Sequence, residues 1–370
     1  MGRKYDVKTL DALRQGEYET KVKGVPILVK PIPEGGKDGD MDPRLYKSMR
    51  FLPLLGKFMM KPKKNMTIEE KIKPIRKMFA TYKGVYVVKE GVISEEKSVK
   101  SSDGYEVPFR IYQRVQHGKN LPILLYYHGG GFFGGSMDIV EQMCKLLVEK
   151  LDCIVINVGY RLCPEAHYPQ PLDDCWAATC WAYEHAAELG SNGKLAVAGD
   201  SAGGNLAAAV TLRDRDECRG MVKMQVLIYP AVNIAGKLTE FYHGTDISLY
   251  HKSSHHAKLI DSMVGLLGDA SSMLDEVYLQ GYLDPQHIYA SPLLDDFHDL
   301  PSTLLMFGEH DFLAFEDFAY ARHAHKAGVD LKVIVYRGLG HGFADQIGVM
   351  PQAEDLIEEV AAAMNVKLHE

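Results

Sequence analysis

The sequence lacks several features that would each point to a particular class of protein. No apolar run approaches the ~20 residues needed to span a bilayer, and the first residues have no apolar core of the signal-peptide kind. The six cysteines are scattered without a C-x-x-C pair, so neither a zinc site nor a disulfide framework is indicated. A net charge of −7 lacks the basic excess of a nucleic-acid-binding protein. We therefore expect a cytoplasmic protein with no membrane span, no nucleic-acid partner and no metal.

The composition is that of an ordinary globular protein. The 370 residues are 46% hydrophobic and 25% charged, which allows a large core and one or two domains. From residue 121 onward, short apolar runs alternate with helical patterns, as in a parallel α/β sheet. We expect strands at residues 85–88, 95–100, 106–113, 121–127, 153–158, 195–198, 224–230, 303–307 and 331–336, with 25–30 as a further candidate. We expect helices at residues 138–150, 206–212, 255–267, 272–279, 316–327 and 353–364, in a stretch ending near 189, and twice within 41–84.

The most informative stretch is Gly199-Asp-Ser-Ala-Gly203, a match to G-x-S-x-G between a predicted strand and a predicted helix. A strand-to-helix turn of this kind strains the Ser backbone and lifts its hydroxyl clear of the sheet. Glycine is needed two positions either side, because a side chain there would collide across so tight a turn. The motif also occurs by chance, and a Ser needs a base, an orienting acid and an oxyanion hole. Ser201 is therefore a candidate nucleophile whose partners must be found elsewhere in the chain.

A glycine run, Gly129-Gly-Gly131, follows the buried strand expected at residues 121–127. Glycines at the carboxyl end of a strand free backbone N–H groups to converge on a ligand. A flexible turn and a phosphate loop are the alternatives, but no G-K-[ST] completes a Walker motif. Together with the Ser motif downstream, the run favours an oxyanion-hole loop of the HGGG type.

Asp311 and His341 follow the last two predicted strands. Ligands bind at the carboxyl edge of an open parallel sheet, so both residues should meet Ser201 and the glycine run there. The order Ser…Asp…His is that of the α/β-hydrolases. Glu309 is a rival acid two residues before Asp311. The pair His255-His256 lacks a third ligand at a sensible spacing, so it does not predict a metal site.

These motifs together resemble the hormone-sensitive-lipase-like branch of the α/β-hydrolases, the bacterial esterases that carry HGGGF and GDSAGG. The resemblance runs from about residue 41 to the C-terminus, and the first forty residues have no counterpart that we can place. It rests on five motifs, namely His128-Gly-Gly-Gly-Phe132, Tyr160-Arg-Leu-Cys-Pro-Glu165, Gly199-Asp-Ser-Ala-Gly-Gly-Asn205, Ser291-Pro-Leu293 and Gly340-His-Gly-Phe343. It implies an α/β-hydrolase fold, with a doubly wound, mostly parallel sheet of about eight strands and a helical cap.

The resemblance also implies a role for each site residue. Ser201 is the implied nucleophile, His341 the general base and acid, and Asp311 the residue that orients the histidine. The oxyanion would be bound by three backbone N–H groups, those of Gly130, Gly131 and Ala202. Three aromatic side chains are expected to contact the substrate, namely Phe132, Phe133 and Phe312. No cofactor is implied.

Supporting residues and departures from the family pattern are visible as well. Glu165 resembles a structural residue near the site, and Arg161 is expected to pair with an acid below it. Phe312 stands where the family often has Pro after the acid. Ala166 stands where His is usual, with His167 one place later. The first departure concerns the loop of the acid, and the second concerns a supporting residue only.

The implied division of the chain has four segments. These are an N-terminal extension with cap helices at 1–84, the first part of the hydrolase core at 85–230, a cap insertion at 231–290 and the second part of the core at 291–370. The insertion interrupts the regular alternation of strands and helices, which is why a cap is the natural assignment.

The predicted function is a serine carboxylesterase that hydrolyses short-to-medium acyl esters of small molecules through an acyl-enzyme. A deacetylase or amidase of a specific metabolite would use the same triad, so it stays open as an alternative. A non-catalytic ligand-binding protein of the hydrolase fold is an alternative from another class. The helices within 41–84 could also form an interaction surface. A homodimer is one candidate assembly, by analogy with related esterases.

Overall fold

The structure, a computed structural model, describes residues 2–50, 66–271 and 273–369. In these residues ten strands form one sheet with the order β1-β2-β10-β9-β8-β7-β5-β6-β4-β3. The strands are β1 (Tyr18–Val22), β2 (Val25–Lys30), β3 (Val92–Lys100), β4 (Glu106–Arg114), β5 (Leu121–Tyr127), β6 (Ile154–Val158), β7 (Ser191–Asp200), β8 (Val222–Ile228), β9 (Ser302–Gly308) and β10 (Leu331–Tyr336). In this order, each strand from β2 to β6 pairs in parallel with the next. The pairs β1–β2, β6–β4 and β4–β3 are antiparallel. The expected mostly parallel sheet is confirmed, with ten strands rather than about eight.

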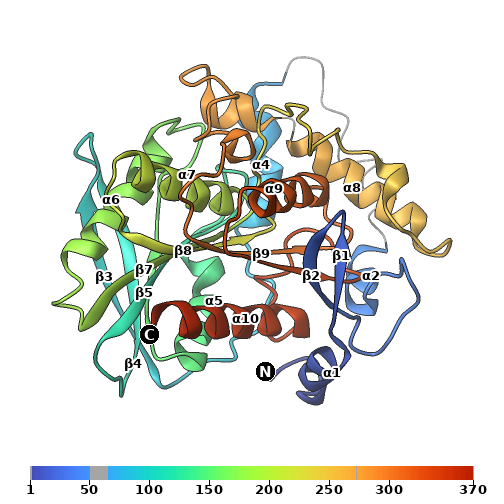
Figure 1. The fold of residues 1–370 in the computed structure, drawn as a ribbon, viewed down its shortest axis with the longest axis horizontal. Coiled ribbons are helices and arrows are strands. Elements are labelled where there is room, and N and C mark those ends of the chain that lie inside the picture. Colours follow the sequence, from blue (N-terminus) through green and yellow to red (C-terminus); the bar gives the residue numbers. More distant parts are fainter. Residues whose placement is uncertain (1, 51–65, 272, 370) are drawn as a thin grey trace.

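Helices cover both faces of the sheet, as a doubly wound fold requires (Figure 1). One face carries α1 (Lys8–Gly16), α5 (Met137–Lys150) and α10 (Pro351–Leu368), and the other carries α6 (Gln170–Glu184), α7 (Ala202–Asp216) and α9 (Ala314–Lys326). The central strands are buried on both faces, since every residue of β5 and β6 is buried. Strands buried in this way need continuous apolar sequence, which is why these two were readable as apolar runs.

In the described part of the chain, three further α-helices lie outside the two covering layers. These are α2 (Pro43–Met49), α4 (Ile68–Phe79) and α8 (Ala257–Ser271), and α4 and α8 lie on the same side of the sheet as α9 (Figure 1). Helix α4 begins with a capping box, because Thr67 and Glu70 cap each other reciprocally. Part of the helical stretch expected within 41–84, namely residues 51–65, lies outside the described residues. The helix expected at 272–279 is reduced to a single turn of π-helix at Asp275–Leu279, and its first residue lies outside the described residues.

The N-terminal residues extend the sheet. Strand β2 pairs in parallel with β10, and β1 closes a hairpin on β2. The hairpin is fixed by Lys30, whose side chain is fully buried and whose ammonium group donates to Glu17 at 2.5 Å and Glu359 at 2.6 Å. The outer strand β1 is exposed at four of its five residues. Charged residues on such an edge discourage pairing with another chain.

The predicted strand at 85–88 is wrong. The backbone N–H groups of this segment bond to a loop carbonyl and to a side chain, and among the described residues they form no strand pairing. Val85 donates its N–H to the Ile347 carbonyl at 2.7 Å, and Val87 and Val88 both donate to the side-chain oxygen of Gln142, at 2.8 and 3.0 Å. A glutamine side chain thus takes the place of a neighbouring strand, which an alternating apolar pattern cannot reveal.

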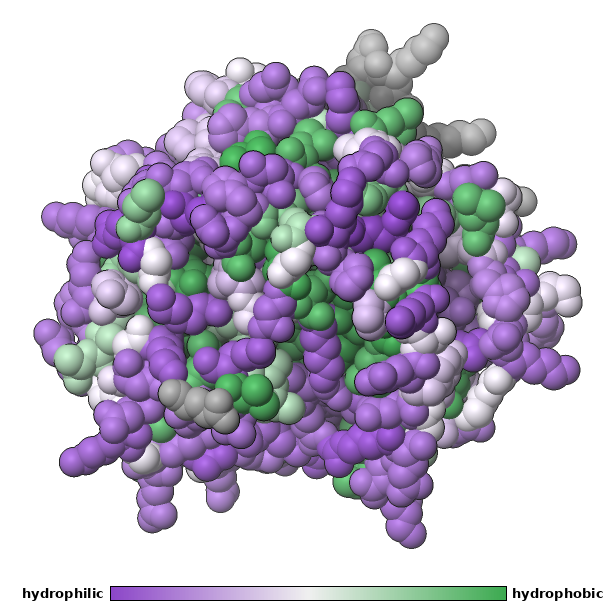
Figure 2. Space-filling view, in the orientation of Figure 1, coloured by the Kyte–Doolittle hydropathy of each residue, from purple (hydrophilic) through white to green (hydrophobic). Residues whose placement is uncertain are grey.

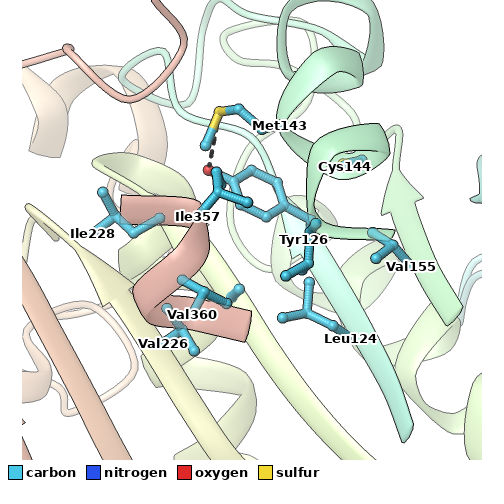
Figure 3. A pocket seen from close by; sticks show the side chains of 11 residues that line it. Leu124, Tyr126, Met143, Cys144, Val155, Val226, Ile228, Ile357 and Val360 are labelled. Carbon is cyan, nitrogen blue, oxygen red and sulfur yellow. Dashed lines mark hydrogen bonds between the residues drawn. The ribbon is translucent and has the colours of Figure 1, made fainter. Parts of the chain in front are cut away.

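Most residues of the core are apolar, although ionisable side chains such as Lys30 and Asp317 are buried as well. The face seen in Figure 2 is mostly hydrophilic, with hydrophobic residues gathered in the recesses between elements. Figure 3 shows a small apolar cavity between the sheet and helices α5 and α10, where Tyr126 points its hydroxyl toward the sulfur of Met143 at 3.9 Å. This cavity belongs to the packed core. In the described part of the chain, no helix is both long and apolar enough to cross a membrane.

Candidate active site

Ser201 lies at a sharp turn between the end of β7 and the first residue of α7. Its backbone has φ 55° and ψ −118°, a conformation that L-residues rarely adopt. The glycines on either side explain how the turn fits. A Cβ at Gly203 would lie 1.9 Å from the carbonyl oxygen of Tyr127, and one at Gly199 would lie 2.2 Å from the carbonyl oxygen of Gly203. The sequence around Ser201 therefore builds the nucleophile-elbow geometry that G-x-S-x-G predicts.

Ser201, His341 and Asp311 form a continuous hydrogen-bonded chain. Ser201 Oγ lies 2.8 Å from His341 Nε2, and His341 Nδ1 lies 2.9 and 3.0 Å from the two carboxylate oxygens of Asp311. A proton on Nδ1 satisfies the carboxylate, which leaves Nε2 free to accept the serine proton. Asp311 is fully buried and also accepts the N–H of Leu313 at 2.9 Å, so its carboxylate is held in one orientation.

The sheet explains why these residues meet. Asp311 follows β9 and His341 follows β10, and the ends of these parallel strands, Gly308 and Tyr336, are paired. The rival acid Glu309 lies elsewhere, because it accepts the N–H of Gly338 at 2.9 Å. The structure thus brings together the three residues that the sequence selected and keeps the rival apart.

The glycine loop after β5 is tightly folded. Gly134 donates its N–H to the Gly130 carbonyl at 2.8 Å, and a Cβ at Gly130 would lie only 2.2 Å from the Gly134 carbonyl oxygen. Gly130 and Gly131 both have positive φ, at 126° and 62°. Among the described residues, neither of their N–H groups donates a hydrogen bond. The N–H of Ala202, the first residue of α7, has no intrahelical partner either.

The three predicted aromatic residues have different surroundings. The ring of Phe312 lies 4.7 Å from that of His341 and is partly exposed. Phe133 is almost fully buried, with its ring 6.1 Å from that of Phe79 in α4. Phe132 is fully buried and stacks on Tyr278 at 3.9 Å between ring centroids. Phe312 is therefore the member of the set that lies directly beside the triad.

Sequence reasoning missed Asp200, the residue before the serine. Its Oδ1 accepts the N–H of Gly129 and the hydroxyl proton of Tyr126, both at 2.9 Å. Burial raises the pKa of this carboxyl, and the two hydrogen bonds act in the opposite direction. Asp200 therefore ties the glycine loop to the serine turn. The position of Asp200 inside the G-x-S-x-G motif could have indicated its importance. Its role could not be read from the sequence, because both partners lie more than 70 residues away.

Sequence reasoning also missed two buried carboxyl groups in the first turn of α9. Burial raises the pKa of Glu316 to about 8, although its Oε1 accepts the N–H of Val232 at 2.8 Å. Burial raises the pKa of Asp317 well above its ordinary value, and the charge of Asp311 acts in the same direction. Neither Asp317 oxygen has a hydrogen-bond partner in the described structure. Both groups are thus held as neutral acids behind the carboxylate of Asp311.

The supporting residues lie as follows. Arg161 pairs with Asp174 at 2.7 Å and with Asp103 at 2.6 Å, which confirms the expected acid partner. Glu165 pairs with Arg76 of α4 at 2.7 Å. Within residues 2–50, 66–271 and 273–369, no group of three or more His, Cys, Asp or Glu residues is arranged to hold a metal ion.

Comparison with known proteins places this geometry in a family. Residues 124–345 match a protein family whose description is "alpha/beta hydrolase fold". Carboxylesterase NlhH of Mycobacterium tuberculosis is 31% identical over 276 residues, which cover 74% of this chain and 83% of that protein. Arylacetamide deacetylase of Bos taurus is 30% identical over 294 residues, which cover 66% of this chain and 74% of that protein.

A solved structure agrees with the sequence comparisons. The hyperthermophilic esterase of the archaeon Pyrobaculum calidifontis superimposes with a TM-score of 0.70 at 30% identity, over 88% of this chain and 98% of that one. Fold, motif order and sequence similarity lead to the same assignment. The chain therefore belongs to the α/β-hydrolase family, in its hormone-sensitive-lipase-like esterase branch.

Proposed function

We propose that this chain is a serine carboxylesterase that hydrolyses short-to-medium acyl esters of small molecules. The observation that carries the proposal is the hydrogen-bonded chain from Ser201 through His341 to Asp311, with its links at 2.8 and 2.9 Å. The relatives named as carboxylesterase and esterase support the reaction class. Ester hydrolysis is therefore the simplest use of this site.

In the proposed acylation step, Ser201 Oγ attacks the ester carbonyl carbon while its proton moves to Nε2 of His341. The bond between the carbonyl carbon and the alcohol oxygen then breaks, and the same proton goes to the leaving alcohol. In the second half, water attacks the acyl carbon and gives one proton to Nε2. The bond between that carbon and Ser201 Oγ then breaks, the proton on Nε2 returns to Oγ, and the carboxylic acid is released. Asp311 stays ionised throughout and stabilises the imidazolium that forms twice in each cycle.

The negative charge of each tetrahedral intermediate would be held by the N–H groups of Gly130, Gly131 and Ala202. Two features support this assignment. The two glycine N–H groups donate to no described residue, and the Ala202 N–H opens helix α7, whose dipole favours negative charge. Loss of one such donor typically costs ~10²–10³ in rate.

We also propose that α4 and the insertion at 231–290 form the cap over this site. Tyr250 of the insertion donates its hydroxyl proton to the Asp311 carbonyl at 2.5 Å, and Tyr278 stacks on Phe132. Phe132, Phe133 and Phe312 would then form the apolar wall against the acyl group. Two expectations from the sequence, a cytoplasmic location and a homodimer, stay predictions that cell fractionation and sedimentation can test.

An amide substrate is the second candidate. The relative named as an arylacetamide deacetylase favours it, because the same triad can release an amine in place of an alcohol. A purely ligand-binding protein is less well supported, since it would not need the serine, histidine and aspartate to be hydrogen-bonded in sequence.

The test is hydrolysis of p-nitrophenyl esters from acetate to palmitate, together with p-nitroacetanilide as the amide. Wild type and Ser201→Ala are compared, with Ser98→Ala on the exposed strand β3 as the matched control. Turnover that peaks at short-to-medium chains, disappears in Ser201→Ala and persists in Ser98→Ala is expected. Turnover that survives Ser201→Ala would refute the nucleophile. Turnover of the anilide alone would favour the amidase, and none with any substrate would favour a binding role.

A further inference from the structure

Arg76, in the last turn of α4, connects three parts of the molecule through one guanidinium group. Its Nε donates to the carbonyl of Phe133 at 2.6 Å, and its Nη2 donates to the carbonyl of Cys163 at 2.5 Å. Both terminal nitrogens also donate to the carboxylate of Glu165 at 2.7 Å. The planar fork of arginine suits such a set of acceptors, and bonds from a charged donor are stronger than neutral ones.

The Phe133 carbonyl belongs to the glycine loop that carries the candidate oxyanion donors. The loop is closed internally by bonds from the N–H groups of Phe133 and Gly134 to the Gly130 carbonyl, at 3.2 and 2.8 Å. It is held from outside at two consecutive carbonyls. That of Phe132 accepts the N–H of Cys163 at 2.9 Å, and that of Phe133 accepts from Arg76. Among the described residues, Phe133 has no other donor to its carbonyl.

A second contact joins α4 to the same loop independently of Arg76. The ring of Phe79 packs beside Gly134, where an added Cβ would lie 3.0 Å from Cδ2 of that ring and 3.1 Å from its Cβ. The absence of a side chain at Gly134 therefore lets the helix approach the loop closely. Arg76 and Phe79 lie three residues apart and so share one face of α4.

We propose that Arg76 is a positioning residue for ester hydrolysis. By holding the Phe133 carbonyl, it fixes the direction of the N–H groups of Gly130 and Gly131, and it makes their alignment depend on the docking of α4. The proposal rests on the proposed function. The ion pair between Arg76 and Glu165 is secondary, because the Glu165 side chain is 65% exposed and exposed ion pairs contribute little to stability.

The test compares Arg76→Met and Glu165→Gln with wild type in p-nitrophenyl acetate hydrolysis. The matched control is Arg110→Met, since Arg110 also bridges two acids but lies on β4, next to the outermost strand β3 at the far edge of the sheet. Active sites are counted with a phosphonate that titrates Ser201, so that rates refer to competent protein. Inhibition by a trifluoromethyl ketone, whose serine adduct needs the oxyanion donors, gives a readout that a purely structural role would not move.

Arg76→Met should lower kcat by about 10- to 100-fold, with KM within about twofold of wild type. The inhibition constant of the ketone should rise by a similar factor. Glu165→Gln and Arg110→Met should each stay within about threefold of wild type, because Arg76 keeps both carbonyl bonds in the first and is untouched in the second. Unchanged kcat and inhibition constant in Arg76→Met, with only a lowered Tm, would overturn the proposal and leave the esterase assignment intact.

Gly134→Ala supplies an independent perturbation if Arg76→Met does not fold. The added methyl group presses on Phe79 and should separate α4 from the loop, because the contact is tighter than ordinary van der Waals distance. We expect both kcat and ketone binding to weaken in parallel, and unchanged values would refute the coupling. Absence of hydrolysis in wild type itself would instead refute the proposed function, so the two failures are distinguishable.

Discussion

Glu316 offers a quantitative test of the buried charges behind the triad. It is 8% exposed, and burial raises its pKa to about 8 from an ordinary value of 4.5, with a smaller contribution from the charge of Asp311. Between these two pH values the folded protein keeps a proton that the unfolded chain releases. The free energy of unfolding therefore falls as the pH rises from 4.5 to about 8, and Glu316 causes no further change above that.

The magnitude follows from the same two values. The interval from 4.5 to about 8, at ~1.4 kcal/mol per pH unit, gives an upper limit of ~5 kcal/mol. Glu316→Gln has no proton to lose, and its side-chain oxygen can still accept the N–H of Val232. In wild type, Glu316 lowers the free energy of unfolding as the pH rises from 4.5 to about 8. Glu316→Gln should not show this decrease.

The assay is urea unfolding of wild type and Glu316→Gln at pH 5, 7 and 9. The stability of the variant relative to wild type should grow by several kcal/mol between pH 5 and pH 9. Asp317 is present in both proteins, so only the part of its titration that depends on the charge of Glu316 differs between them. Glu19→Gln, on the exposed strand β1, is the matched control and should follow wild type at every pH. A difference between Glu316→Gln and wild type that stays constant within ~1 kcal/mol would refute the reasoning.

Three further perturbations test other parts of the fold. Lys30→Met should lower the free energy of unfolding by ~3–5 kcal/mol in urea, because it leaves Asp355 and Glu359 without their buried cation; no loss would contradict the ion network. Gly265→Ala should raise Tm, with a gain of up to ~1 kcal/mol, because alanine favours the α8 helix and nothing lies within 4 Å of the added Cβ. Removal of residues 2–32 should uncover the edge of β10 and cause concentration-dependent association in sedimentation velocity, whereas a stable monomer would count against that role of the hairpin.

The sequence predicted best those elements whose environment is uniform along the chain. The strands at 121–127 and 331–336 have the predicted bounds, because each is a short apolar run whose later residues are all buried. Strand β1 gave no such signal, since it lies at the outer edge with its side chains in solvent. The segment 85–88 gave a false signal, because its backbone bonds to the side chain of Gln142. The local apolar pattern therefore mispredicts a strand where the backbone bonds to a side chain that is distant in sequence.

The same distinction applies to the candidate site. Ser201, Asp311 and His341 were found because each follows a predicted strand, and strand ends converge by topology alone. Their roles stay predictions until variants are assayed. Asp200 and Arg76 were not found, because their significance lies in hydrogen bonds to residues 71 and 57 positions away. Only the folded chain brings those partners together.

The two halves of the site are therefore held by different kinds of interaction. The triad loops leave strands whose backbone ladders are continuous up to their ends, with Gly308 opposite Tyr336 and Asp200 opposite Ile228. The glycine loop leaves β5, but its outer side is held by the Arg76 side chain. Since a ladder is cooperative and the separate bonds from Arg76, Cys163 and Asp200 to the glycine loop are not, a disturbance of α4 should reach the oxyanion donors first. For this reason we expect changes in α4 to lower kcat while Ser201, His341 and Asp311 remain hydrogen-bonded.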